Sequence, residues 1–201
     1  MGTDLKFLFT PPGDEAARQT DEIVFVGRLV ETKGLRYLLQ AFAAVHRTRS
    51  DLVLTIVGDG PMKDDVRHLI SALGLDGSVR LLGGMRQSEL PDIYRRATLA
   101  VFPYADQEGF GLVVVEAMGC GCPVIASNLP AIREIIEPGV TGFLTPPGDW
   151  AALADALRQC LADGTLRSRL AMTALDSVRE QFDWPPIAAR YAQTIENCMH
   201  R

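Results

Sequence analysis

A chain of 201 residues, 47% of them hydrophobic and 22% charged, is long enough to fold as one domain with a sizeable core, and this composition excludes a disordered chain. The formal net charge of −5 excludes a protein that binds nucleic acid through overall positive charge, so any phosphate must be held by a local group of cations. The four cysteines have no disulfide or zinc spacing, and the sequence shows neither a signal peptide nor an apolar run of membrane-spanning length, which predicts a cytoplasmic protein.

The chain begins with a segment that lacks a regular pattern. Residues 1–20, which include the turn-forming stretch TPPGDEAARQT, are interpreted as a linker remnant, and residues 21–201 as a single domain. Short apolar runs rich in β-branched residues follow, and turn-forming residues bound most of them. They predict strands at 22–27, 52–58, 79–83, 99–104 and 123–127, with a sixth near 142–146.

Helical patterns separate these strands. Apolar residues recur with helical spacing within residues 35–45 and 66–73, so an amphipathic helix crosses between successive strands. Asp149 is a predicted N-cap, two further helices follow, and residues 185–186, both proline, mark the start of the last one. This alternation predicts an α/β fold: a doubly wound parallel sheet of about six strands with flanking helices. Its ligand site is expected outside the carboxyl ends of the strands.

The loop after the first predicted strand has the sequence GRLVETKG. Gly27 lets the chain turn, Arg28 provides a planar guanidinium group, and Lys33 adds a second cation just before a helix. Two cations at a strand-to-helix junction suit a diphosphate. The alternative is that both are ordinary surface charges, although cations near the start of a helix oppose its dipole.

The loop after the second predicted strand, VGDGPMKDD, permits a close approach of the backbone at Gly58 and Gly60. It does not match the dinucleotide-binding pattern, because Lys63 stands where G-x-G-x-x-G requires its third glycine. Asp59 is interpreted as a cap of the helix that follows.

The stretch EGFGLVVVEAM, residues 108–118, places two glutamates eight positions apart around an apolar segment. Two glycines flank Phe110, and a helix is expected to begin after them, so that bare backbone N–H groups form an anion cradle. Glu108 then stands before the helix and Glu116 about two turns into it, where it could hold a ribose diol. The alternative is a helix-start charge and an exposed helix residue. Against it, the apolar neighbours of Glu116 predict a buried carboxylate, which requires partners.

The segment EGFGLVVVEAMGCGCPVIAS closely resembles the E-x7-E segment of the retaining glycosyltransferases of family 4. GRLVETKG and VGDGP resemble that family's other donor-site motifs and occur in the same order. The resemblance covers residues 22–184 and includes GVTGFLTPPGD. It implies the GT-B architecture of two facing Rossmann-like domains, and this chain looks like the C-terminal domain, which binds the nucleotide sugar and has extra C-terminal helices.

The resemblance also implies roles for individual residues. Arg28 and Lys33 would bind the donor diphosphate, Glu108 would contact the transferred sugar, and these three form the expected catalytic group; Glu116 would hold the ribose. The other expected donor-binding positions lie in the same loops and at the start of the following helix: Gly27, Gly58, Met85 (a base contact through its backbone), Gly109, Phe110, Gly111, Leu112 and Val113. The expected donor is a hexose linked to UDP or GDP, with no metal and no other cofactor.

The departure from the family lies in the length of the chain. Enzymes of this family are usually about twice as long and carry an N-terminal domain that binds the acceptor. We therefore expect this chain to need such a domain as its partner, to be inactive alone, and to touch a membrane only peripherally, through the missing domain. The alternatives are a non-catalytic nucleotide-binding module and a subunit of a split glycosyltransferase that needs a partner chain. The missing glycine pattern disfavours a nicotinamide-binding domain.

Overall fold

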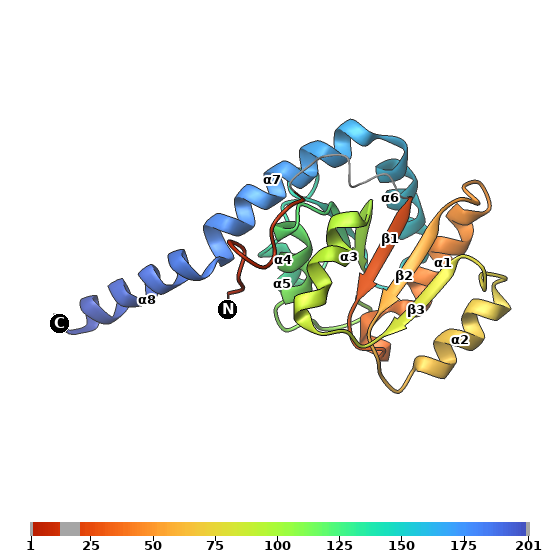
Figure 1. The fold of residues 1–201 in the computed structure, drawn as a ribbon, viewed down its shortest axis with the longest axis horizontal. Helices are drawn as coiled ribbons and strands as arrows, with labels where there is room; N and C mark the ends of the chain where they lie inside the picture. Colours follow the sequence, from red (N-terminus) through yellow and green to blue (C-terminus); the bar gives the residue numbers. More distant parts are fainter. Residues whose placement is uncertain (1, 13–20, 200–201) are drawn as a thin grey trace.

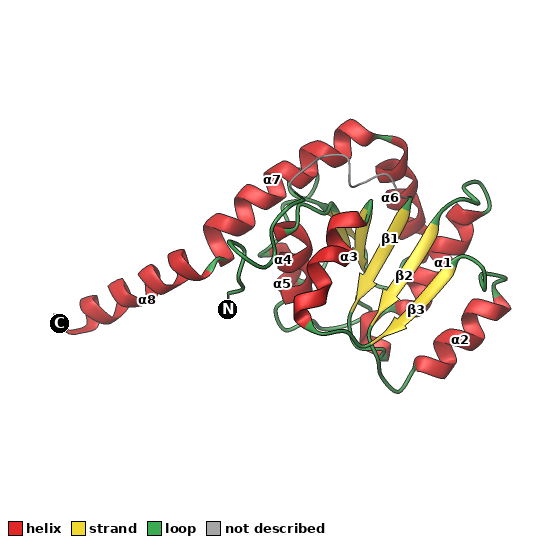
Figure 2. Ribbon diagram, in the orientation of Figure 1, coloured by secondary structure: helices red, strands yellow, loops and turns green. Residues whose placement is uncertain are grey.

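The structure is a computed structural model that describes residues 2–12 and 21–199. A parallel sheet forms its centre (Figures 1 and 2). It has six strands in the order β3-β2-β1-β4-β5-β6. The strands are β1 (Glu22–Val26), β2 (Val53–Val57), β3 (Val79–Gly83), β4 (Leu99–Phe102), β5 (Val124–Ser127) and β6 (Phe143–Thr145). The strand order reverses between β1 and β4, which is where open α/β sheets bind ligands, beside the carboxyl ends of the strands.

Helices cover both faces of the sheet, as crossovers between parallel strands require (Figure 1). One face packs against α1, α2 and α6, and the other against α3, α4, α5 and α7. The helices and short 3-10 turns are η2 (Glu31–Lys33), α1 (Leu35–His46), α2 (Lys63–Ala72), η3 (Gln87–Glu89), α3 (Leu90–Arg96), α4 (Leu112–Gly119), α5 (Pro130–Arg133), α6 (Trp150–Ala162), α7 (Gly164–Phe182) and α8 (Trp184–Met199). Within the described parts of the chain, none of these helices combines the length and apolarity that crossing a lipid bilayer demands.

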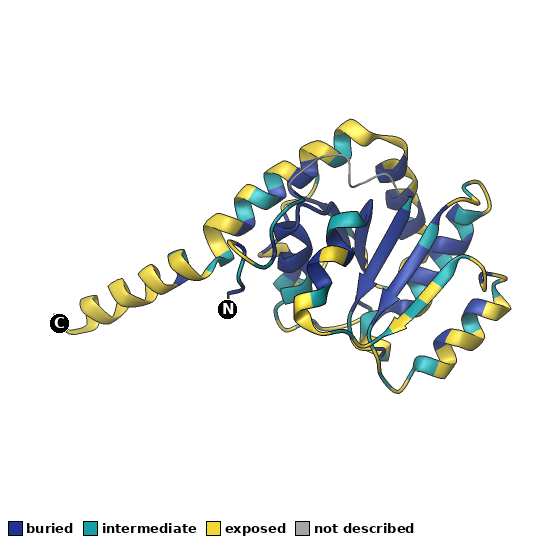
Figure 3. Cartoon of the chain, in the orientation of Figure 1, coloured by how far each residue is buried: buried dark blue, intermediate teal, exposed yellow. Residues whose placement is uncertain are grey.

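The core consists of two apolar layers, one on each face of the sheet. Along β1, Ile23 and Phe25 belong to one layer and Val24 and Val26 to the other, because successive side chains of a strand point to opposite faces. Every residue of β1 is buried, which explains why the four residues after Glu22 form a continuous apolar run in place of an alternation. Figure 3 shows the contrast between the buried central strands and the largely exposed α8.

The described N-terminal segment packs beside the C-terminal helices. Leu5 and Phe9 are fully buried in one of the apolar layers. Thr3 forms a β-bridge with Asp183, whose Oδ1 also accepts a hydrogen bond from the backbone N–H of Leu5 at 3.2 Å. Residues 13–20 lie outside the described parts of the chain, so the interpretation of 1–20 as a linker remnant stays a prediction.

Each predicted strand is present in the structure. The strand expected at 99–104 ends at Phe102, because Pro103 has no backbone N–H to donate to a neighbouring strand. Asp149 caps α6 as predicted, since its side chain accepts hydrogen bonds from the first backbone N–H groups of that helix. The two prolines at 185–186 lie in the first turn of α8, also as predicted.

Candidate functional site

The loops that follow β1 and β4 lie against each other at the carboxyl edge of the sheet. Gly34 ends the η2 turn with a φ of 68°, and a Cβ atom there would lie 1.8 Å from the carbonyl oxygen of Pro103. The backbone N–H of Ala105 donates to the carbonyl oxygen of Thr32 at 2.9 Å. Only glycine permits so close an approach, so backbone contacts hold the first loop against the second.

Lys33 lies at this junction and contacts two residues of the β4–α4 loop. Its Nζ forms an ion pair with Oε2 of Glu108 and lies 4.8 Å from the centre of the Tyr104 ring. The side chains of Lys33 and Glu108 are 23% and 14% exposed, so protein shields the pair from most of the solvent. The backbone N–H of Gly109 donates to the other carboxylate oxygen of Glu108 at 3.1 Å. The structure thus brings together two predicted site residues from different strands.

Arg28 belongs to the same loop as Lys33, and its side chain is exposed. No described residue forms an ion pair or a hydrogen bond with its guanidinium group. Gly27 and Gly58 shape the backbone beside it. The N–H of Gly27 donates to Val57 at 3.0 Å, and a Cβ at Gly58, where φ is 146°, would lie 1.8 Å from the carbonyl oxygen of Gly27. Glycine at position 58 therefore lets the β2 loop contact the β1 loop.

The helix α4 begins where the apolar stretch begins. Gly111 is its N-cap residue, no side chain of the described chain caps this end, and Leu112 and Val113 are half-buried in its first turn. The first amide N–H groups of a helix have no partner within the helix and carry the positive end of its dipole. The Phe110 ring packs edge-on against Phe182 in α7 with the ring centres 5.6 Å apart, which anchors the loop to that helix.

Glu116 lies in the second turn of α4 and is only 3% exposed, so the alternative of an exposed helix residue is wrong. Its Oε1 accepts a hydrogen bond from the side-chain amide of Gln87 at 2.6 Å. Burial raises the pKa of the Glu116 carboxyl to about 7, and the hydrogen bond from Gln87 acts in the opposite direction. A carboxylate with this one donor keeps acceptor capacity for the hydroxyl groups of a ligand.

Met85 lies in the loop between β3 and η3 and is half-buried. Its side chain packs against the apolar layer that includes Val24 and Val26, so the core already occupies part of its surface. A contact between its backbone and a nucleotide base stays a prediction.

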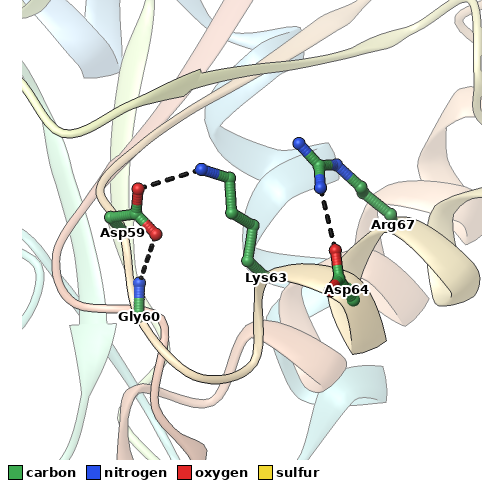
Figure 4. A network of polar contacts seen from close by, with 5 residues as sticks. All are labelled: Asp59, Gly60, Lys63, Asp64 and Arg67. Carbon is green, nitrogen blue, oxygen red and sulfur yellow. Dashed lines mark hydrogen bonds and ion pairs between the residues drawn. The ribbon is translucent and has the colours of Figure 1, made fainter.

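Asp59 does not cap α2, so that prediction is wrong. The N-cap residue of α2 is Met62, and no side chain caps it. The Asp59 carboxylate accepts a hydrogen bond from the backbone N–H of Gly60 at 2.8 Å and pairs with Nζ of Lys63 at 2.9 Å (Figure 4). Asp59 stands three residues before the N-cap, which is too far from the first N–H groups of the helix for its short side chain.

Three residues that shape this site were not predicted: Gly34, Tyr104 and Gln87. Gly34 directly precedes the predicted helix and Tyr104 ends a predicted strand. In the sequence, only this position next to the expected site could have indicated that they belong to it. Gln87 bonds to a residue 29 positions away in the sequence, and no local pattern indicates such a contact.

The groups at the carboxyl edge of the sheet suit a ligand with a negatively charged middle and hydroxyl groups at either end. Arg28, Lys33 and the N-terminus of α4 offer positive charge and N–H donors on neighbouring loops, while Glu108 and Glu116 offer acceptors. Among the described residues, His, Cys, Asp and Glu side chains do not gather in any group of three or more that could hold a metal ion.

Comparisons with known proteins point to one family. Residues 13–176 match the family model of glycosyl transferases group 1. A phosphatidyl-myo-inositol mannosyltransferase from Mycobacterium leprae is 37% identical over 175 residues, which are 87% of this chain and 46% of the relative. A glycogen synthase from Mycobacterium tuberculosis is 34% identical over 172 residues, which are 86% of this chain and 41% of the relative. The chain therefore spans less than half the length of these relatives.

Solved structures show the same fold. HepE from Anabaena in complex with UDP has a TM-score of 0.88 and 27% identity, with 98% of this chain and 56% of HepE covered. The same protein has also been crystallised with UDP-glucose. The C-terminal domain of LpcC, a glycosyl transferase group 1 family protein from Francisella tularensis, has a TM-score of 0.81 and 26% identity, with 91% of this chain and 100% of that domain covered. The Rossmann-like fold predicted from the sequence is thus confirmed.

Proposed function

The chain belongs to the glycosyl transferases group 1 family, and on that premise we propose that it is the donor-binding domain of a retaining glycosyltransferase. The donor is a hexose linked to a nucleoside diphosphate. The observation that carries the proposal is the junction of the β1 and β4 loops, where Lys33 and Glu108 meet beside the N-terminus of α4. At this edge of the sheet, a cation and free amide N–H groups suit the phosphate oxygens of a sugar diphosphate, and a carboxylate suits the hydroxyl groups of its sugar.

The positive groups stabilise the leaving group. When the bond between sugar and phosphate breaks, negative charge grows on the diphosphate, and fixed cations and dipoles near it lower the barrier. Arg28, Lys33 and the N-terminus of α4 do this in the proposed reaction, so no metal ion is required. The exposed Arg28 guanidinium has its donors available for phosphate oxygens, because no described residue occupies them.

The two carboxylates have separate tasks in this proposal. Glu108 contacts the sugar, since it lies with Lys33 at the loop junction, whereas Glu116 lies in the second turn of α4 and holds the ribose hydroxyls. Retention follows if the acceptor attacks from the face that the diphosphate leaves. In that reaction Glu108 positions and electrostatically supports the sugar without becoming a nucleophile.

The acceptor lies beyond this chain in the proposal. Because the relatives are more than twice the matched length, an N-terminal domain of the same protein is the proposed partner that binds the acceptor. The chain alone is then inactive, the reaction is cytoplasmic, and any contact with a membrane is made by the other domain. The second candidate, favoured by the same partial coverage, is a non-catalytic module or one subunit of a split enzyme. The DNA sequence directly upstream shows whether an N-terminal domain belongs to the same reading frame or whether this chain is made separately.

A thermal-unfolding panel tests the proposal. The 201-residue chain is heated with UDP, GDP, ADP or NAD⁺, each at a series of concentrations. A ligand at 100 times its dissociation constant adds about 2.7 kcal/mol to the free energy of unfolding. We expect at least one nucleoside diphosphate to raise the melting temperature. Stabilisation by NAD⁺ alone, or by none of the four ligands, contradicts the proposed function.

A further inference from the structure

Tyr104 is a buried aromatic residue beside the proposed site, and its hydroxyl has no hydrogen-bond partner in the described structure. It follows β4, is 1% exposed, and its ring stacks on that of Phe102 with the ring centres 6.3 Å apart and the planes at 20°. An unpartnered buried hydroxyl is a cost to the fold. The ring, and not the hydroxyl, therefore explains what this residue contributes.

The face of this ring contacts a cation. Nζ of Lys33 lies 4.8 Å from the ring centre, well within the distance at which an ammonium group is attracted to an aromatic face. The same Nζ pairs with Glu108. The two contacts differ in kind, because the carboxylate occupies an N–H donor of Lys33 and offsets its charge, whereas the ring does neither.

Backbone contacts fix the ring relative to Lys33. Gly34 follows Lys33 directly and packs on the carbonyl group of Pro103, the residue before Tyr104. On the other side, the N–H of Ala105 donates to Thr32 at 2.9 Å. The neighbours of Lys33 in sequence thus contact the neighbours of Tyr104, and the two side chains meet between these contacts.

We propose that Tyr104 is a positioning residue that holds the Lys33 ammonium group at the donor diphosphate while leaving its N–H groups for phosphate oxygens. The inference rests on the proposed function. When Glu108 turns to the sugar of the donor, Lys33 loses its carboxylate partner, and the ring keeps the ammonium group in place. Burial, and then the negative charge of Glu108, hold the pKa of the Tyr104 phenol far above its usual range, so the ring stays neutral.

A double-mutant cycle tests the inference. Binding to the 201-residue chain is measured by calorimetry, with UDP or, if GDP or ADP raises the melting temperature more, with that nucleotide in its place. The proteins compared are the unaltered chain, Tyr104→Phe, Tyr104→Leu, Lys33→Met and Lys33→Met with Tyr104→Leu. We expect Tyr104→Phe to bind within about twofold of the unaltered chain and Tyr104→Leu about three- to tenfold more weakly, since an aliphatic side chain has no negative face. In the Lys33→Met background, Tyr104→Leu should cause no further loss.

A second variant keeps the test valid if Tyr104→Leu fails to fold. Pentafluorophenylalanine at position 104 keeps the shape of phenylalanine but reverses the electrostatic potential of the ring face, and it should weaken UDP binding as Tyr104→Leu does. Equal binding by this variant and by Tyr104→Phe overturns the inference. So does an equal loss from Tyr104→Leu with and without Lys33. If the unaltered chain binds none of UDP, GDP and ADP, the proposed function itself is wrong.

Discussion

Two lysine–carboxylate pairs lie at the carboxyl edge of the same sheet, and their surroundings differ. In the Lys33–Glu108 pair, the side chains are 23% and 14% exposed, and an aromatic ring lies under the lysine. In the Lys63–Asp59 pair, they are 35% and 55% exposed, and the two residues are four positions apart in sequence (Figure 4). The first pair joins two loops that are distant in sequence, whereas the second closes a single loop.

The difference shows that burial and contacts between distant loops distinguish an ion pair of a candidate site from an ordinary surface ion pair. An exposed pair four residues apart contributes little, because water screens the charges and both side chains lose freedom. The enclosed pair depends on contacts made by the whole sheet, including the approach of Gly34 to Pro103. The exposed pair therefore offers matched control variants for the enclosed one.

The largest expected difference separates the two lysines. Lys33→Met should weaken UDP binding by about 10- to 100-fold, because a charged hydrogen bond to the diphosphate, about 1.5–3 kcal/mol, is lost. Lys63→Met should leave the affinity within about twofold, since its partner is a local carboxylate. Calorimetry on both variants measures this, and equal losses would break the comparison.

A second comparison pairs Arg28, a residue of the candidate site, with Arg67, an exposed arginine of α2. Arg28→Ala should weaken UDP binding by about tenfold or more through the loss of charged hydrogen bonds. Arg67→Ala is the matched control, because Arg67 is also exposed but pairs with Asp64 in α2, at 2.8 Å (Figure 4). The same titration checks both variants, and unchanged affinity for Arg28→Ala removes this residue from the site.

The raised pKa of Glu116 predicts that donor binding depends on pH. Its pKa of about 7 means that the carboxylate form, which accepts bonds from ribose hydroxyls, increases between pH 6 and 8. The affinity for UDP-glucose should therefore rise several-fold over this range, and Glu116→Gln should abolish the rise. UDP-glucose is the suitable probe because its diphosphate does not titrate there. A rise that persists in Glu116→Gln contradicts the assignment.

The stability of the ligand-free chain should change in the opposite direction. The folded-state pKa of Glu116 lies above its ordinary value of 4.5, so the unfolded chain releases this proton first. Its contribution to the free energy of unfolding is fully present below pH 4.5 and is lost as pH rises through about 7. Urea unfolding at pH 5 and pH 8 should show this loss in the unaltered chain and not in Glu116→Gln, and an equal loss in both would assign it to other groups.

Glu108 should distinguish the nucleotide sugar from the free nucleotide. Glu108→Gln should leave the affinity for free UDP within about twofold, but should weaken UDP-glucose binding about three- to tenfold, because it removes a charged acceptor from the sugar. Competition calorimetry with both ligands compares them. A parallel loss for UDP and UDP-glucose would show that Glu108 does not distinguish the sugar from the nucleotide.

Local patterns in the sequence predicted the sheet and much of the candidate site. Continuous apolar runs identified the six strands, and the start of α4 after Gly111 followed from its glycine-rich loop. Individual side-chain contacts between distant segments were not predictable. The bond from Gln87 to Glu116 and the ring under Lys33 depend on how loops meet after the sheet has formed. Asp59 was wrongly interpreted as a cap because the start of α2 lies later than its loop suggested.

A crystal structure of the 201-residue chain with UDP-glucose would show where the donor binds. We expect the diphosphate within hydrogen-bonding distance of Arg28, Lys33 and the first amide N–H groups of α4, with Glu116 at the ribose and Glu108 at the glucose. Density for the ligand at the amino ends of the strands, or a diphosphate that contacts neither cation, would contradict this expectation.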